Sequence, residues 1–201
     1  MNVFLRIGAY LFHPLLMPLL GTLIYFVVTP RFVDRDLLLA KLTAVCIISF
    51  LIPLVTYFLL KNLHIVSSIQ LEDVKERKVP LMLQCLLLLL IIKMVFNPYD
   101  SPELYYFFIA VLFSAISALI LVFLKQKISL HQMAISGVAM FVIGLSVHFK
   151  VNLLVWIILL FFANGWVASS RLHTNSHTPA ELIMGFFLGV IPQLILLNFW
   201  L

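Results

Sequence analysis

The sequence predicts an all-α fold, a polytopic bundle of six or seven transmembrane helices. Of its 201 residues, 64% are hydrophobic and only 10% are charged, whereas about a quarter of the residues in soluble domains are charged. Apolar runs recur along nearly the whole chain, and each approaches the roughly 20 residues that a helix needs to cross a bilayer. Because these runs are continuous rather than alternating, they favour helices over strands.

Seven apolar segments follow one another along the chain. Pro14 and Pro18 interrupt the first segment, so it is expected to be kinked or to enter the membrane without crossing it, which keeps six crossings open beside seven. No hydrophilic domain or low-complexity linker separates the segments, so residues 1–201 are expected to form one integral-membrane domain. The segments are 7–29, 37–60, 81–96, 104–124, 133–148, 151–168 and 180–200.

The connections between these segments fall into two groups. Three are short and chemically plain, and three are rich in polar side chains. Two crossings separate each rich connection from the next, so all three are expected on the same side of the membrane, as a shared site requires. The plain connections are 30–36, 97–103 and 149–150, and the rich ones are 61–80, 125–131 and 169–179.

The charge of +5 does not indicate a nucleic-acid partner. The basic residues are spread over short loops without a basic face, so anionic lipid headgroups explain them better. Eight cations on the rich side against five on the other nominally place the rich loops in the cytoplasm. Arg77 and Arg171 are candidates for functional retention, however, and without them the difference is too small to orient the chain. Cys46 and Cys85 lie inside apolar runs and are expected to behave as small hydrophobic residues.

The last rich connection carries the strongest motif. Ser170 and Arg171 are followed after five residues by His177 and after three more by Glu181, a spacing of S-R-x5-H-x3-E. His177 and Glu181 are four residues apart, so on a helix that starts here they share one face. The carboxylate can then orient the imidazole and make its other nitrogen a better nucleophile or base. Arg171 offers a planar set of donors suited to phosphate oxygens.

The two other rich connections hold similar side chains. Ser129 and His131 open the fifth apolar segment. Gln70 and Arg77 are seven residues apart, which places both on one face of a regular helix, and Pro80 leads into the third segment.

In this order, the three blocks resemble the type 2 phosphatidic acid phosphatase superfamily, whose pattern is K-x6-R-P, then P-S-G-H, then S-R-x5-H-x3-D. The third block matches except that Glu181 replaces Asp. The second keeps Ser and His but has Ile128 and Leu130 for Pro and Gly. The first keeps Arg77, has Gln70 for Lys and carries its Pro two residues late. The resemblance covers about residues 70–189 of the single domain.

The resemblance implies a metal-independent and cofactor-independent lipid phosphatase. His177 would be the nucleophile that forms a phosphohistidine, His131 the acid and base, and Glu181 the group that orients His177. The phosphate-binding residues would be Arg171, Arg77, Ser129, Gln70 and Ser170. The partner would be a lipid phosphomonoester or diphosphate within the membrane lipids. The resemblance further implies a bacterial inner membrane with an extracytoplasmic active site, whereas the charge bias points the other way.

Other interpretations remain open. Gln70 removes one cation from the expected pocket, and Leu130 restricts the approach of backbone amides. These changes also fit an inactive relative that binds anionic lipid or serves as a subunit. A transporter would need polar residues deep in the apolar runs, and few are present. Neither the substrate lipid nor the oligomeric state follows from the sequence.

Several residues also have simpler interpretations. His13, His64 and His148 are expected to be interfacial residues without a chemical role. His173 and His177, four residues apart, allow zinc binding only with a third ligand. For His131, Arg171 and His177 the simpler alternative is a polar cluster that holds helix ends together. The Gly185–Gly189 pair is expected to serve packing inside the bundle.

Overall fold

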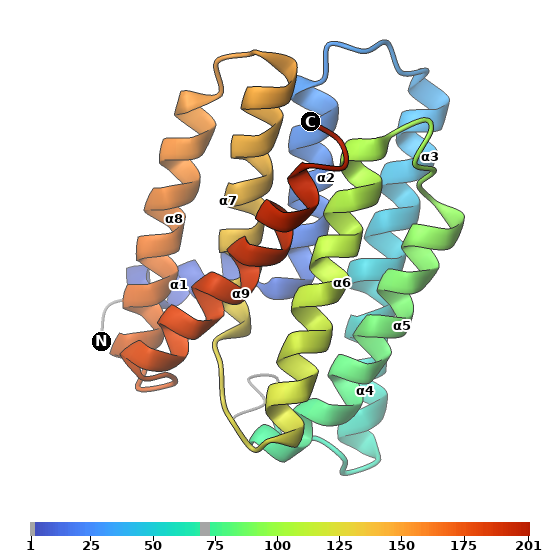
Figure 1. Cartoon of the computed structure of the whole chain (residues 1–201). Coiled ribbons are helices and arrows are strands. Elements are labelled where there is room, and N and C mark those ends of the chain that lie inside the picture. The colour runs from blue at the N-terminus through green and yellow to red at the C-terminus, as the bar shows by residue number, and fades with distance from the viewer. Residues whose placement is uncertain (1–2, 69–72) are drawn as a thin grey trace.

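The structure is a computed structural model that describes residues 3–68 and 73–201, and all of its regular structure is helical (Figure 1). Six helical stretches are long and apolar enough to cross a membrane, which confirms the predicted all-α bundle. The helices are α1 (Val3–Leu11), η1 (Pro14–Leu16), α2 (Met17–Val28), α3 (Arg35–Cys46), η2 (Ile47–Leu51), α4 (Ile52–Asn62), η3 (Val74–Arg77), α5 (Lys78–Met94), α6 (Pro102–Phe123), α7 (Leu130–Phe149), α8 (Leu154–His173) and α9 (Pro179–Leu197).

The first apolar segment is broken, as the prolines predict. α1 ends at Leu11, and His13 takes an extended conformation before Pro14 opens the 3-10 turn η1. α1 packs beside α8 because Gly8 has no side chain: a Cβ there would lie 2.9 Å from the Trp166 indole nitrogen. The break therefore turns the chain from α1, against α8, into the upright α2 (Figure 1).

The third apolar segment is the short one. α5 has 17 residues and begins at Lys78, three residues before the predicted start at residue 81. Pro80 lies in its first turn, where a missing N–H leaves no intrahelical hydrogen bond unmade. Among the described residues, six helical stretches are long and apolar enough to cross a membrane. Together with the shorter α5 they match the predicted six or seven helices.

A π-helical turn joins α3 to α4. Pro53 lacks the N–H that an α-helix would require, and the π-helical turn at Ile47–Leu51 precedes it in a helical stretch that continues from Arg35 to Asn62. Phe50 and Pro53 line the cavity described below.

The core lies where α6 and α7 face each other and α9 packs against α7. The rings of Phe107 and Phe141 stack with centroids 4.3 Å apart. On α9, a Cβ at Gly185 would approach the Ser129 carbonyl oxygen at 2.5 Å, and one at Gly189 would overlap the Met133 carbonyl oxygen. This bears out the expected packing role of the two glycines and holds the first turns of α7 and α9 together.

The described parts of the three rich connections lie at the end of the bundle opposite the C-terminus (Figure 1). At the other end, the carboxylate of the fully buried Glu103 lies 2.7 Å from the Arg31 guanidinium and 3.0 Å from His148 Nε2. It also accepts a hydrogen bond from the Tyr25 hydroxyl at 3.2 Å. His148, predicted to be interfacial without a chemical role, lies in the last turn of α7 and contacts the buried Glu103.

Candidate active site

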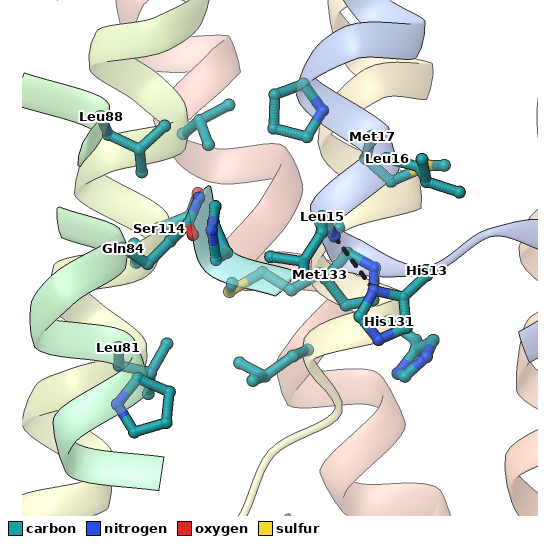
Figure 2. Close-up of a pocket in the computed structure, with 18 of the residues that line it drawn as sticks. His13, Leu15, Leu16, Met17, Leu81, Gln84, Leu88, Ser114, His131 and Met133 are labelled. Atoms are coloured by element: carbon teal, nitrogen blue, oxygen red, sulfur yellow. Dashed lines mark hydrogen bonds between the residues drawn. The ribbon is translucent and has the colours of Figure 1, made fainter. Parts of the chain in front are cut away.

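A cavity of about 420 Å³ opens among the rich connections. Its mouth carries the charged side chains, and its interior, between α2, α4, α5, α6 and α7, is mostly apolar but includes Gln84 and Ser114 (Figure 2). The polar lining residues at the mouth are Tyr10, His13, Arg77, Lys127, His131, Arg171, Ser176 and His177, and the apolar ones include Leu88, Phe107, Val111, Ala115, Gly137 and Val138.

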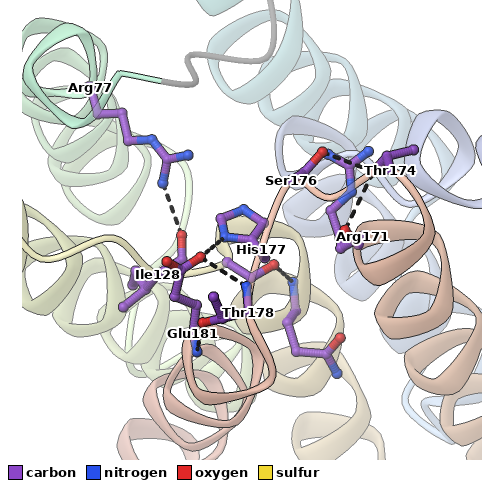
Figure 3. Close-up of polar contacts among 10 residues, drawn as sticks. Arg77, Ile128, Arg171, Thr174, Ser176, His177, Thr178 and Glu181 are labelled. Carbon is purple, nitrogen blue, oxygen red and sulfur yellow. Dashed lines mark hydrogen bonds and ion pairs between the residues drawn. The ribbon is translucent and has the colours of Figure 1, made fainter.

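His177 and Glu181 form the predicted pair. The His177 Nδ1 lies 2.6 Å from a Glu181 carboxylate oxygen, and the imidazole is 5% exposed (Figure 3). His177 is not on the helix, however, because α9 begins at Pro179 and Thr178 is its N-cap. Glu181 completes a capping box with Thr178, and the same carboxylate oxygen accepts the Thr178 N–H at 3.3 Å. The cap therefore holds the carboxylate that orients His177.

This environment keeps His177 neutral at physiological pH. Burial, together with the cationic Arg77 and Lys127, lowers the pKa of His177 to about 4, although Glu181 opposes the shift. Because the neutral Nδ1 faces a carboxylate, it carries the ring proton and donates it to Glu181. The lone pair is then on Nε2, the nitrogen available to an electrophile.

His131 lies in the first turn of α7 and lines the same cavity. The ring of His13 meets that of His131 edge to face with centroids 5.3 Å apart (Figure 2). The broken first segment therefore helps to position His131.

Three cations surround the mouth, and no Asp or Glu is among the described residues that line the cavity. Arg77 is held by the Ile128 carbonyl oxygen, which accepts from its guanidinium at 2.9 Å (Figure 3). Arg171 is only 6% exposed, and its Nε finds no hydrogen-bond partner in the described part of the chain. A buried donor without a partner is unfavourable, so an anionic ligand in the mouth would satisfy it.

Two predicted phosphate-binding serines lie behind the cavity rather than in its lining. Ser129 is the N-cap of α7: its hydroxyl accepts the Gln132 N–H at 3.3 Å, and its N–H donates to the Glu181 carbonyl at 3.2 Å. Ser170 is fully buried, and its hydroxyl has no partner among the described residues. Ser129 thus ties α7 to α9, which brings His131 and His177 to one site.

Gln70 lies outside the described residues. The predicted common helical face of Gln70 and Arg77 therefore stays a prediction. Among the described residues, Asp73 is extended and its carboxylate caps the 3-10 turn Val74–Arg77 by accepting the Lys75 N–H at 2.9 Å.

The sequence interpretation missed Lys127 and misjudged His13. Lys127 lies two residues before Ser129 in a loop with no periodicity, so only its nearness to the second block pointed to it. His13 was predicted to be interfacial, but it lines the cavity; its position before Pro14 at a helix break was the available signal. His173 is exposed at the end of α8. Unlike His177, it does not line the cavity.

No protein-family model, no curated protein and no solved structure matches this chain.

Proposed function

We propose that the protein is a membrane-embedded lipid phosphatase that acts through a phosphohistidine without a metal ion. The observation that carries this proposal is one cavity that joins an oriented, neutral His177 and three cations to an apolar interior within the membrane-spanning helices. A phosphate group fits the cationic mouth, and an acyl or prenyl chain fits the apolar interior.

The first chemical step is an in-line attack of His177 Nε2 on phosphorus. The N–P bond forms as the bond between phosphorus and the lipid oxygen breaks, and protonated His131 gives its proton to that oxygen. A phosphate dianion in the mouth itself favours the protonated form of His131, because opposite charges stabilise each other. Arg171 stabilises the charge on the equatorial oxygens together with Arg77 and Lys127.

The second step releases phosphate. His131, now neutral, takes a proton from water, whose oxygen attacks phosphorus as the N–P bond breaks. Glu181 accepts the Nδ1–H bond in both steps and stabilises the positive charge that develops on His177. The chain's own residues thus provide the nucleophile, the acid and base, and the charge stabilisation.

Phosphate release by the purified protein in detergent with EDTA tests this function. The substrates are phosphatidic acid, phosphatidylglycerophosphate, a polyprenyl diphosphate and a lipid A-type phosphate. We expect release from at least one lipid by the wild type and a loss of at least 1,000-fold, about 4 kcal/mol, in His177→Ala. His173→Ala, the matched control, changes a nearby exposed histidine outside the cavity and should retain full activity.

Equal activity in the two variants would contradict the nucleophilic role of His177. Phosphate binding without release from any lipid, by folded wild-type protein, would instead favour an inactive protein that binds anionic lipid.

A further inference from the structure

His13 reaches the cavity because the first apolar segment breaks in front of it. With φ −65° and ψ 139°, His13 is the N-cap of η1, and Pro14 follows as the first residue of that turn. A continuous helix from α1 into α2 would place residue 13 on a helical surface instead. The break directs the side chain toward His131, as Figure 2 shows.

The cap also determines which nitrogen of His13 carries a proton. Nδ1 accepts the backbone N–H of Leu15 at 3.3 Å, so the neutral ring must hold its proton on Nε2. No hydrogen bond from Nε2 to another described residue is present, which leaves this donor available at the mouth of the cavity.

The surroundings of His13 consist of donors and cations. Its neighbours at the mouth are Tyr10 from α1, His131 from α7 and Arg171 from α8, and the described lining contains no carboxylate that could accept from it. A ligand group that accepts from all these donors must present several oxygens and negative charge. An apolar chain offers no acceptor to these groups, and a water molecule brings no negative charge to Arg171.

We propose that His13 is a substrate-contacting residue whose Nε2–H donates a hydrogen bond to a phosphate oxygen on the His131 side of the cavity. This inference rests on the proposed function where turnover is measured. The affinity for inorganic phosphate tests the role of His13 without turnover. It makes the broken N-terminal segment part of the site rather than a membrane anchor alone.

Two substitutions of His13 test its Nε2–H donor separately from its role as the N-cap of η1. His13→Asn keeps an acceptor for the Leu15 N–H, as Asn is a favoured N-cap residue, but its amide is too short to replace Nε2. His13→Gln extends an amide donor to about the position of Nε2 and loses the cap geometry. His173→Asn is the matched control, because His173 is exposed and outside the cavity lining.

We expect His13→Asn to lower kcat/KM by about 10- to 100-fold, the effect of one hydrogen bond to a charged group. The loss should appear mainly in KM, because the bond forms with the bound substrate as well as in the transition state. The Kd of inorganic phosphate, measured by titration calorimetry, should rise by a similar factor. His13→Gln should recover most of the loss, and His173→Asn should equal the wild type.

The outcomes distinguish this inference from the proposed function. Full activity and unchanged phosphate affinity in His13→Asn, with His177→Ala inactive, would overturn the role of His13 and leave the phosphatase intact. Phosphate affinity that depends on His13 in a protein with no turnover would support the contact and contradict the phosphatase. Should His13→Asn unfold, the wild type decides: saturating inorganic phosphate must shift the ¹⁵N signal of His13 Nε2, and an unchanged signal would overturn the proposal.

Discussion

At the scale of single residues, the site depends on how a helix cap orients one imidazole. Glu181 is both the N3 residue of the α9 capping box and the acceptor for His177, so the start of the helix and the proposed nucleophile share one carboxylate. Glu in place of the Asp found in the resembling family is compatible with both contacts. The S-R-x5-H-x3-E spacing predicted the His177–Glu181 contact, but the contact arises from the cap of α9 and not from two residues on one helical face.

The depressed pKa of His177 predicts a pH dependence. Since burial and nearby cations lower this pKa to about 4, the neutral nucleophile persists as the pH falls and is lost only near that value. Lys127→Gln removes one of those cations, so the pKa of His177 should rise and the acid limb of kcat/KM should move to higher pH. A pH profile with one lipid substrate measures this shift.

Lys125→Gln is the control for this profile, because Lys125 is exposed and outside the cavity lining. Its acid limb should coincide with that of the wild type. An acid limb that moves equally in both variants, or that moves to lower pH in Lys127→Gln, would show that Lys127 does not act on His177.

At the scale of helices, close packing of α7 against α9 assembles the site. The Ser129 N–H, at the start of α7, donates to the Glu181 carbonyl of α9 at 3.2 Å, and two glycines of α9 allow this approach. His131 and His177 reach the same cavity because these two first turns meet.

Gly189→Ala is expected to destabilise the protein by about 1–3 kcal/mol, because the added methyl group overlaps the Met133 carbonyl and the Ser136 hydroxyl. Gly165→Ala is the matched control on α8, where an added Cβ meets no atom within 4 Å. Unfolding of both variants in the same detergent measures the difference. Equal stability of Gly189→Ala and Gly165→Ala would mean that the close packing of α7 against α9 does not contribute to the free energy of unfolding.

The helices were largely predictable, and so was the break in the first one, but the conformation at the break and the start of η3 were not. Apolar runs located every membrane-spanning helix to within a few residues, because burial in lipid imposes the same requirement along each run. The 3-10 turn η1 and the late start of η3 arise from local caps by His13 and Asp73. Such caps compete with helical periodicity, so a periodic pattern alone does not predict where these turns begin.

At the scale of the whole molecule, the two ends of the bundle differ in chemistry. The end with the rich connections gathers cations around a cavity, whereas the other end buries Glu103 in a satisfied ion-pair cluster. Counting the crossings was sufficient to predict that the rich connections share one end. The cavity depends on side chains from distant segments, so its shape and the presence of His13 and Lys127 in its lining required the three-dimensional structure.

This arrangement predicts the sidedness of single cysteines placed in a background without Cys46 and Cys85. Asn175→Cys and Lys125→Cys, both exposed near the cavity, should react with an impermeant reagent from the same side of the membrane. Tyr99→Cys, at the opposite end and 92% exposed in the wild type, should react from the other side. Labelling of all three from one side would contradict the topology. Family resemblance leads us to expect the first two to label from outside the cytoplasm.

The most direct test of the central claim is to trap the covalent intermediate. His131→Asn removes the base of the hydrolysis step, and a phosphate ester with an acidic leaving group, such as p-nitrophenyl phosphate, needs no acid in the first step. With that substrate, a quench at alkaline pH, where phosphohistidine survives, followed by mass spectrometry should find a phosphoryl group on His177. Control reactions with His177→Ala should show no such adduct. Turnover without any adduct, or a phosphoryl group on another residue, would contradict the proposed phosphohistidine mechanism.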